Sequence, residues 1–237
     1  MSVDDLREQV CAANKALVAA GLVTLSFGNA SGIDRAAGIM IIKPSGVPYE
    51  TLRPGDLVAV EIESGATEAG AFRPSSDTAT HLALYRRYPA IGGVVHTHSS
   101  WASAWAQAGR AIPCFGTTHA DHFHGPVPVT RALAPGELGT TYEADTGAVI
   151  IETLETLGMA PLEMPAVLVR SHGPFTWGAD AAEAVANAVA LEAVAAMAQR
   201  TLALGAAAET IDEALLERHF GRKHGPSAYY GQVDRRG

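Results

Sequence analysis

The chain has 237 residues and a net charge of −8 with histidine counted as neutral. This length suffices for one sizeable α/β domain with a well-filled core, and no linker-like or low-complexity stretch divides it. Lys and Arg are scattered apart from two small groups near the C-terminus, which argues against a nucleic acid as partner. We therefore expect a single domain over residues 1–237.

The cysteines and the start of the chain indicate its compartment. Cys11 and Cys114 lie in apolar or turn-like contexts without CxxC spacing, so neither a disulfide framework nor a cysteine zinc site is expected. The first residues carry the acidic pair Asp4-Asp5 instead of a basic targeting segment, and we expect no membrane-spanning run. These features predict a cytoplasmic protein that does not act at a membrane.

The first quarter of the chain predicts a helix followed by antiparallel strands. Apolar residues at helical spacing mark a surface helix from about Asp4 to Ala20, which Gly21 ends. The stretch from Leu22 to Arg35 fits either a strand or a loop that approaches a ligand. Strands are expected at Gly38–Ile42 and Leu57–Ile62, with turn residues after the second, as in an antiparallel meander.

Hydroxyl and carboxyl side chains cluster where the next helix begins. Ser75, Ser76 and Asp77 follow Pro74, and each has the chemistry of a helix N-cap. Two hydroxyls with exposed amides at a helix N-terminus also form an anion site suited to phosphate. The pattern leaves both roles open.

The stretch Gly92–His98 predicts a buried strand that ends in two histidines. Side chains on a strand alternate, so His96 and His98 are expected on one face, about 7 Å apart along the strand. Such a pair is either hydrogen-bonded or suited to bind one metal ion. A second apolar strand, Ala166–Arg170, delivers His172 at its end. Three imidazoles would complete a catalytic zinc site with one open position.

The remaining segments alternate between helices and one irregular region. The periodicity predicts helices at Ser99–Ala108, about Glu143–Leu157, Ala179–Ala208 and about Ile211–Arg222, whereas Pro113–Val129 is irregular and rich in titratable side chains.

Six motifs, taken together and in order, resemble the class II aldolase family, which includes the head domain of adducins. The likeness extends from the first helix to Gln232 and is strongest to bacterial sugar-phosphate epimerases of that family. The motifs are Lys43-Pro44-Ser45-Gly46-Val47, Pro74-Ser75-Ser76-Asp77-Thr78, Gly92-Gly93-Val94-Val95-His96-Thr97-His98, Gly116-Thr117-Thr118-His119-Ala120-Asp121, Ser171-His172-Gly173-Pro174-Phe175, and Lys223-His224-Gly225 with Ala228-Tyr229-Tyr230-Gly231-Gln232.

This resemblance implies an α/β fold with a central, largely antiparallel β-sheet flanked by helices on both faces, a three-layer arrangement. It also implies a divalent metal, usually zinc, and a homotetramer with active sites at subunit interfaces. Three imidazoles with a carboxylate accept manganese or cobalt as well.

The resemblance further implies a role for each matching residue. Asp77, His96, His98 and His172 correspond to the metal site, and Gly28, Asn29, Lys43, Ser45, Gly46, Ser75 and Ser76 correspond to phosphate and substrate contacts. Asp121 and Tyr230 correspond to the proton-transferring pair, with Tyr230, in the tail 223–237, reaching a neighbouring subunit.

The implied activity is the interconversion of L-ribulose 5-phosphate and D-xylulose 5-phosphate, as in L-arabinose breakdown. The inverted carbon bears no acidic C–H, so the C3–C4 bond must break and form again. Retro-aldol cleavage leaves a dihydroxyacetone enediolate, which a Lewis-acid metal stabilises, and glycolaldehyde phosphate, which must stay bound. The aldehyde then rotates about its phosphate, so proton-transfer groups are needed on both sides.

Two alternatives remain at this point. An aldolase acting on L-fuculose or L-rhamnulose phosphate would release its aldehyde, but such enzymes commonly carry glutamate at the position of Asp77. A non-catalytic, adducin-like domain would lack the metal histidines, which are present here. One departure is that His122 and His124 stand where close relatives have aromatic residues, and they either substitute neutrally or change the charge near Asp121.

Overall fold

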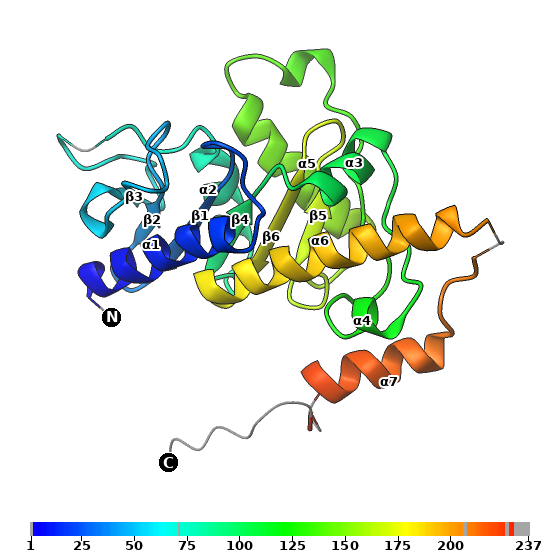
Figure 1. Cartoon of the computed structure of the whole chain (residues 1–237). Coiled ribbons are helices and arrows are strands. Elements are labelled where there is room, and N and C mark those ends of the chain that lie inside the picture. Colours follow the sequence, from blue (N-terminus) through cyan, green and yellow to red (C-terminus); the bar gives the residue numbers. More distant parts are fainter. Residues whose placement is uncertain (1, 71, 206–207, 226–227, 230–237) are drawn as a thin grey trace.

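Six strands form one antiparallel sheet in the order β3-β2-β1-β4-β6-β5 (Figure 1). The structure is a computed structural model that describes residues 2–70, 72–205, 208–225 and 228–229. The expected antiparallel sheet is confirmed. The strands are β1 (Asn29–Asp34), β2 (Ile39–Ile42), β3 (Val58–Glu61), β4 (Gly93–His96), β5 (Ala166–Leu168) and β6 (Pro174–Gly178).

Apart from the short helix Thr117–Ala120, which lies in the segment Pro113–Val129 that was expected to be irregular, the helices begin close to where apolar periodicity and capping residues predict them. At the first helix, Ser2 accepts a hydrogen bond from Asp5 N, and the Asp5 side chain accepts one from Ser2 N, which completes a capping box. The helices are α1 (Val3–Ala19), α2 (Thr78–Arg87), α3 (Ser100–Ala108), α4 (Thr117–Ala120), α5 (Tyr142–Thr156), α6 (Ala181–Ala203) and α7 (Glu213–His224), with 3-10 turns at Pro54–Asp56 and Pro135–Glu137.

Alternating side chains of the sheet enter two separate cores. In β4, Val94 packs with α2 and α5 residues, whereas Val95 packs with α1 and the first half of α6. In β2, Met40 and Ile42 enter the first core and Ile41 enters the second. The helices therefore cover both faces of the sheet, and the expected three-layer arrangement is confirmed (Figure 1).

The two glycines at the start of β4 allow the chain to pass close to the beginning of α6. A Cβ atom on Gly92 would lie 2.0 Å from the carbonyl oxygen of Ala179, and one on Gly93 would lie 2.2 Å from that of Asp180. No side chain fits in this space. These glycines thus bring β4, which carries His96, against α6.

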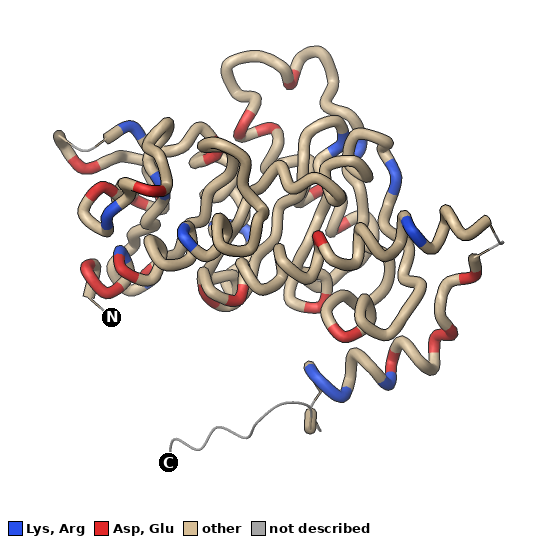
Figure 2. The backbone as a smooth tube through the Cα atoms, in the orientation of Figure 1, with Lys and Arg blue, Asp and Glu red and all other residues tan. Residues whose placement is uncertain are grey.

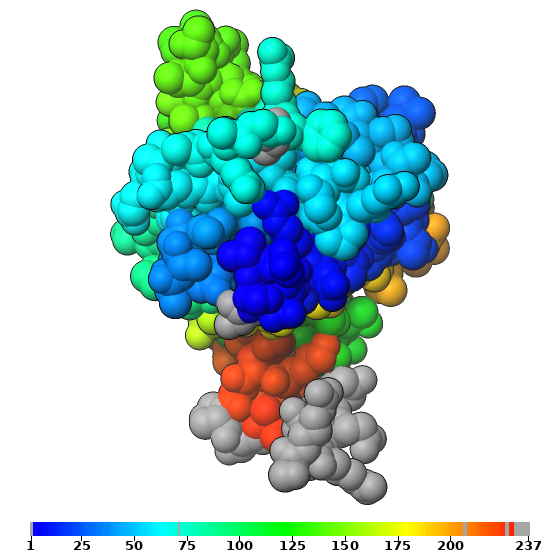
Figure 3. Space-filling model, turned by 90° about the vertical axis from the view of Figure 1, so that its left-hand side faces the viewer, coloured from blue at the N-terminus to red at the C-terminus, as the bar shows by residue number. Residues whose placement is uncertain are grey.

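Helix α7 projects from the rest of the molecule (Figures 1 and 3). Its principal contact is with α4, through an ion pair in which Arg222 Nη2 donates to Asp121 Oδ2 at 2.7 Å. Lys and Arg are distributed over many elements of the described residues (Figure 2), as the sequence indicated.

Helix α6 does not match the expectation that no run is long and apolar enough to span a membrane. Its length and hydropathy alone would allow it to do so. Half of its apolar window (50%) is buried, and it packs against β4 and β6. Core helices of soluble proteins have the same properties, so the helix fits its place against the sheet.

Two strand predictions need correction. The strand expected to continue to His98 ends at His96, and the strand expected over Ala166–Arg170 ends at Leu168. The sequence analysis also missed β6, whose five residues are all buried and therefore lack the alternation of a half-exposed strand. His172 consequently lies in the connection between β5 and β6, beside β4.

Candidate active site

Three histidines from two chain segments meet at one end of the β4–β6 pair. His96 is the last residue of β4, His98 follows two residues later, and His172 lies in the connection before β6. One ligand nitrogen from each of them lies within 4.8 Å of the others. The Nε2 atoms of His96 and His98 are 3.1 Å apart. The hypothesis that the pair meets a third imidazole is thus consistent with this geometry.

The ring of His96 is held in one orientation. Its Nδ1 lies 2.9 Å from the carbonyl oxygen of Pro174, which can only accept, so Nδ1 carries the proton and Nε2 keeps a free lone pair. Its ring also stacks on Phe175, with centroids 4.2 Å apart and an interplanar angle of 18°. Pairing of His96 with Phe175 across the sheet places both contacts.

The surroundings keep the other two histidines neutral. Burial and the neighbouring His96 lower the pKa of His98, and burial with His96 and His98 lowers the pKa of His172 to about 4. Imidazole nitrogens are common ligands of zinc, and three of them around one point fit such a divalent cation. The residues present therefore fit the metal that the resemblance implies.

Asp77 occupies the N-cap position of α2, but its side chain does not cap the helix. Its Oδ2 instead accepts a 2.6 Å hydrogen bond from Asn29 Nδ2. Burial would raise the pKa of Asp77, but the neighbouring His96 and His81 together with the hydrogen bond from Asn29 outweigh it, so this pKa is lowered. Asp77 is thus an ionised carboxylate beside the histidine cluster.

A pocket of about 360 Å³ opens over the histidines. The structure brings eleven of the thirteen predicted site residues together around it, namely Asp77, His96, His98, His172, Gly28, Asn29, Lys43, Ser45, Gly46, Ser75 and Ser76. Their assignment as metal ligands or phosphate contacts stays a prediction, but their position in one pocket gives it a geometric basis.

Lys43 supplies the positive charge of this pocket. Its side chain is buried, its Nζ donates to the carbonyl oxygen of Pro44 at 3.3 Å, and the ammonium lies 4.6 Å from the ring centroid of Tyr49. Burial lowers its pKa. No carboxylate among the described residues forms an ion pair with Lys43, so its charge can pair with an anion in the pocket.

Gly28 brings the loop before β1 against β4. Its φ is +92°, and a Cβ atom there would lie 2.7 Å from the carbonyl oxygen of His96. Both facts require glycine. The open question about the Leu22–Arg35 stretch is therefore answered by a loop through Gly28 that continues into β1.

Asp121 does not reach this pocket within its own chain. It follows α4, and its carboxylate accepts hydrogen bonds from Arg222 Nε at 3.0 Å and Nη2 at 2.7 Å, and from His219 at 3.1 Å. Burial opposes these contacts, but the hydrogen bonds from Arg222 and His219 lower the pKa of Asp121. Its predicted partner Tyr230 lies outside the described residues.

The two unusual histidines near Asp121 contact α7. Lys223 Nζ donates to His122 Nε2 at 3.2 Å, and His124 Nε2 lies 2.6 Å from Glu217 Oε1. Burial and Lys223 lower the pKa of His122 to about 4. The His122 side chain is therefore uncharged at neutral pH and adds no positive charge beside Asp121.

The sequence analysis missed Tyr142, which lines the pocket. Its hydroxyl lies 3.3 Å from His172 Nδ1. Tyr142 is the first residue of α5 and lies one residue before the predicted helix start. The predicted N-terminus of that helix was the sequence signal that could have identified Tyr142.

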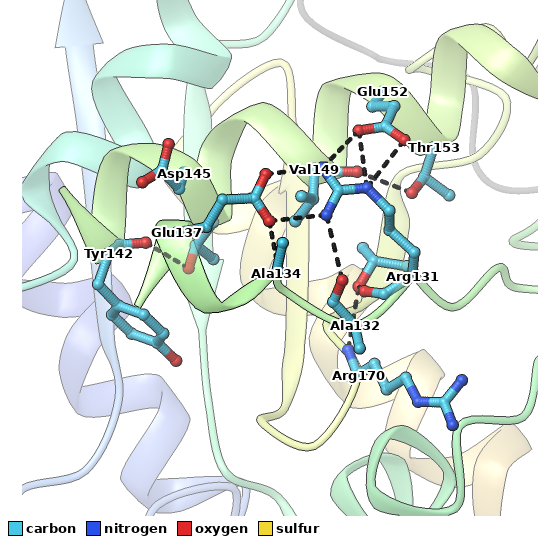
Figure 4. A network of polar contacts seen from close by, with 12 residues as sticks. Arg131, Ala132, Ala134, Glu137, Tyr142, Asp145, Val149, Glu152, Thr153 and Arg170 are labelled. Atoms are coloured by element: carbon cyan, nitrogen blue, oxygen red, sulfur yellow. Dashed lines mark hydrogen bonds and ion pairs between the residues drawn. The ribbon is translucent and has the colours of Figure 1, made fainter. Parts of the chain in front are cut away.

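An exposed network anchors the segment before α5. Arg131 pairs with Glu137 and Glu152, while the Tyr142 ring points away from them (Figure 4).

Comparisons with known proteins identify the family of the chain. The family "Class II Aldolase and Adducin N-terminal domain" matches residues 8–199. The chain belongs to this family. It is 56% identical over 227 residues to the "L-ribulose-5-phosphate 4-epimerase UlaF" of Salmonella paratyphi C, covering 96% of this chain and 98% of that protein, and equally identical to the protein of that name from Salmonella typhi.

Solved structures share the fold. An L-fuculose 1-phosphate aldolase superposes with a TM-score of 0.76 at 21% identity, covering 91% of this chain and 94% of that one. YgbL of Escherichia coli, described as a putative aldolase/epimerase/decarboxylase, superposes with a TM-score of 0.70 at 25% identity, covering 91% and 98%. At 21% identity, the comparison with the L-fuculose 1-phosphate aldolase supports the fold alone.

Proposed function

We propose that the chain is an L-ribulose-5-phosphate 4-epimerase that interconverts L-ribulose 5-phosphate and D-xylulose 5-phosphate by breaking and re-forming the C3–C4 bond. The observation that carries this proposal is one pocket that is lined by three imidazoles and a buried lysine. The 56% identity to epimerases over nearly the whole chain supports the choice of substrate. Pentose breakdown, including that of L-arabinose, would use this reaction.

His96, His98 and His172 would hold the divalent metal, with Asp77 beside them. Zinc is the metal we propose, and manganese or cobalt would suit the same donors. When bound, such a cation supplies a Lewis acid for the oxygens of the ketose. The free lone pair of His96 Nε2, imposed by the Pro174 carbonyl, supports this assignment.

The phosphate group would be held by the lysine and the hydroxyls that line the same pocket. Lys43 provides charge, and the hydroxyls of Ser45, Ser75 and Ser76 with the backbone at Gly46 provide hydrogen-bond donors. A fragment held by its phosphate keeps its place while the aldehyde rotates and presents its other face. Asn29 contributes by donating to both Ser75 Oγ, at 3.0 Å, and Asp77.

Asp121 and Tyr230 would transfer the protons on the two sides of the aldehyde. The hydrogen bonds from Arg222 and His219 keep Asp121 ionised, as an acceptor must be. Because Asp121 lies outside the pocket of its own chain, we propose that a neighbouring subunit supplies it. We also propose a homotetramer with active sites at subunit interfaces, to which the tail 223–237 contributes, and a single domain per chain in the cytoplasm.

The product ratio tests the proposal. Metal-loaded protein is incubated with L-ribulose 5-phosphate, and D-xylulose 5-phosphate is measured against free glycolaldehyde phosphate. We expect the xylulose phosphate to dominate. A predominance of the free aldehyde would identify an aldolase instead, and neither product, together with no stoichiometric divalent metal in the folded protein, would favour a binding domain.

Unphosphorylated L-ribulose provides a second substrate for this assay. The phosphate contacts predict that it reacts very poorly, because its aldehyde fragment would lack the group about which it rotates. Equal rates with both sugars would contradict the rotation of the aldehyde fragment about a bound phosphate.

A further inference from the structure

We propose that Glu192, on α6, is a positioning residue for the metal site and that it acts on His98 through the N-terminus of α3. This inference deepens the proposed function and rests on it for the role of His98. Glu192 itself does not line the pocket.

The carboxylate of Glu192 caps α3 from another helix. Glu192 Oε1 accepts a hydrogen bond from Trp101 N at 2.8 Å, and Oε2 accepts one from Ala102 N at 2.9 Å. The first N–H groups of a helix lack partners within it, and Ser99, at the N-cap position, makes no side-chain hydrogen bond to them. A residue distant in sequence therefore performs the function of a local cap.

A second contact fixes the same two helices one turn further along. Trp105 Nε1 donates to the carbonyl oxygen of Ala195 at 3.0 Å. Ala195 lies three residues after Glu192 on α6, and Trp105 lies three residues after Ala102 on α3, so both contacts are on facing sides of the helices. Together they prevent α3 from sliding or rotating on α6.

His98 is the predicted ligand that most needs such support. Among the three histidines it is the exposed one, whereas His96 is buried within β4. The backbone before His98 is attached to the sheet by a 3.3 Å hydrogen bond from Thr97 N to Pro174 O. The backbone after it leads through Ser99 directly into α3. Glu192 thus determines one of the two attachments of the His98 segment.

The negative charge of Glu192 also favours a cation bound at His98. The N-terminus of a helix carries a partial positive charge, and here that end begins two residues after His98. This charge would oppose a cation bound at His98. The carboxylate of Glu192 offsets it, which the neutral amide of glutamine would not do.

The test compares Glu192→Ala and Glu192→Gln with Asp180→Ala. Asp180 is a matched control, because its carboxylate caps α6 by accepting from Glu183 N at 2.8 Å and does not line the pocket. Metal-free protein is titrated with Co²⁺, and the dissociation constant, the visible absorption bands of the cobalt form and the thermal midpoint of the metal-free protein are measured.

We expect Glu192→Ala to weaken Co²⁺ binding about tenfold or more, in the range seen for groups that orient metal ligands, and to shift the cobalt bands. Asp180→Ala should lower the thermal midpoint and leave affinity and bands unchanged. Glu192→Gln keeps an acceptor oxygen and the side-chain volume, so it should fold even where alanine does not, and still bind Co²⁺ more weakly.

Wild-type affinity and spectrum in both Glu192 variants, or in Glu192→Gln if Glu192→Ala does not fold, would overturn this role. The outcome is separate from the proposed function, since wild-type protein that binds Co²⁺ but does not epimerise would refute the activity and leave the Glu192 comparison intact. Wild-type protein that binds no Co²⁺ would overturn both.

Discussion

The side-chain nitrogen of Asn29 lies 2.6 Å from Oδ2 of Asp77 and donates a hydrogen bond to it. A carboxylate accepts only, so this contact defines which atom of the amide is nitrogen. The same nitrogen donates to Ser75 Oγ. One buried amide therefore links the predicted metal site to the predicted phosphate site.

Replacement of Asn29 by alanine should lower kcat/KM for the sugar phosphate about tenfold or more, because a hydrogen bond to a charged group contributes about 1.5–3 kcal/mol. Steady-state kinetics test this. Asn187→Ala is the control, since it removes an amide donor to Trp177 O, at 2.8 Å, on the α6 side of β6. Equal values of kcat/KM in the two variants would show that the Asn29 amide does not connect the two sites functionally.

Tyr142→Phe should weaken metal binding up to about tenfold, because the hydroxyl that helps to orient His172 through Nδ1 is lost. Titration of metal-free protein with Co²⁺ measures the change. Tyr88→Phe is the control, since it removes a buried hydroxyl that has no hydrogen-bond partner among the described residues. If both variants bind metal as the wild type does, Tyr142 is only part of the pocket wall.

Tyr230→Phe should strongly reduce epimerisation while the fold and metal content stay intact, because the substitution removes only the hydroxyl that we propose as a proton-transfer group. The adjacent Tyr229→Phe is the control, as the Tyr229 side chain is largely exposed. Kinetics, metal analysis and circular dichroism are compared for both. Near-normal turnover of Tyr230→Phe would contradict the assignment.

Asp121→Asn and His96→Asn should each be nearly inactive alone but should regain activity when co-expressed in mixed oligomers. The reason is that a site built across subunits can combine an intact Asp121 with an intact histidine cluster from another chain. Activity of the purified mixed oligomers is compared with that of the separate variants. Mixed oligomers without additional activity would place Asp121 and the histidines in the same site of one chain, or outside the reaction.

The metal-free protein should lose stability as the pH falls from about 6.5 to 4. Burial lowers the pKa of His81 to about 3 and, with smaller electrostatic contributions, those of His119 and His172 to about 4, from a usual value of 6.5. In this window the unfolded chain binds more protons than the folded one, so the free energy of unfolding increases with pH. Urea unfolding at pH 7 and pH 5 measures it.

A His122 variant is a further test of how the free energy of unfolding depends on pH. His122, with a pKa lowered to about 4 mainly by burial, contributes to the same window. His122→Asn should therefore flatten the dependence without abolishing it. A free energy of unfolding that is equal at pH 5 and pH 7 would show that these histidines are not kept neutral by the fold.

The sequence predicted most of what local patterns determine. Apolar periodicity located α1, α3 and α6, and the motif residues Lys43 and Ser75 lie in the pocket that their chemistry suggested. The uniformly buried β6 could not be distinguished from a loop, because a strand without exposed positions has no alternation.

Contacts between distant segments were beyond such patterns. Nothing near Glu192 in the sequence indicates that its carboxylate meets Trp101 N, and nothing near Asp121 indicates that α7 holds it. The apolar run Gly92–His98 predicts a strand that continues to His98, whereas the backbone leaves β4 after His96 to enter α3.

The pairing of β4 with β6, in which His96 lies opposite Phe175, has a consequence for biosynthesis. His172 lies in the hairpin of β5 and β6, so its place beside His96 and His98 depends on the pairing of residues 174–178 with β4. β4 and β6 are far apart in the sequence, and such non-local pairings slow folding because the loop between them must close first. Metal captured by all three histidines would thus select chains in which the central strands are already paired.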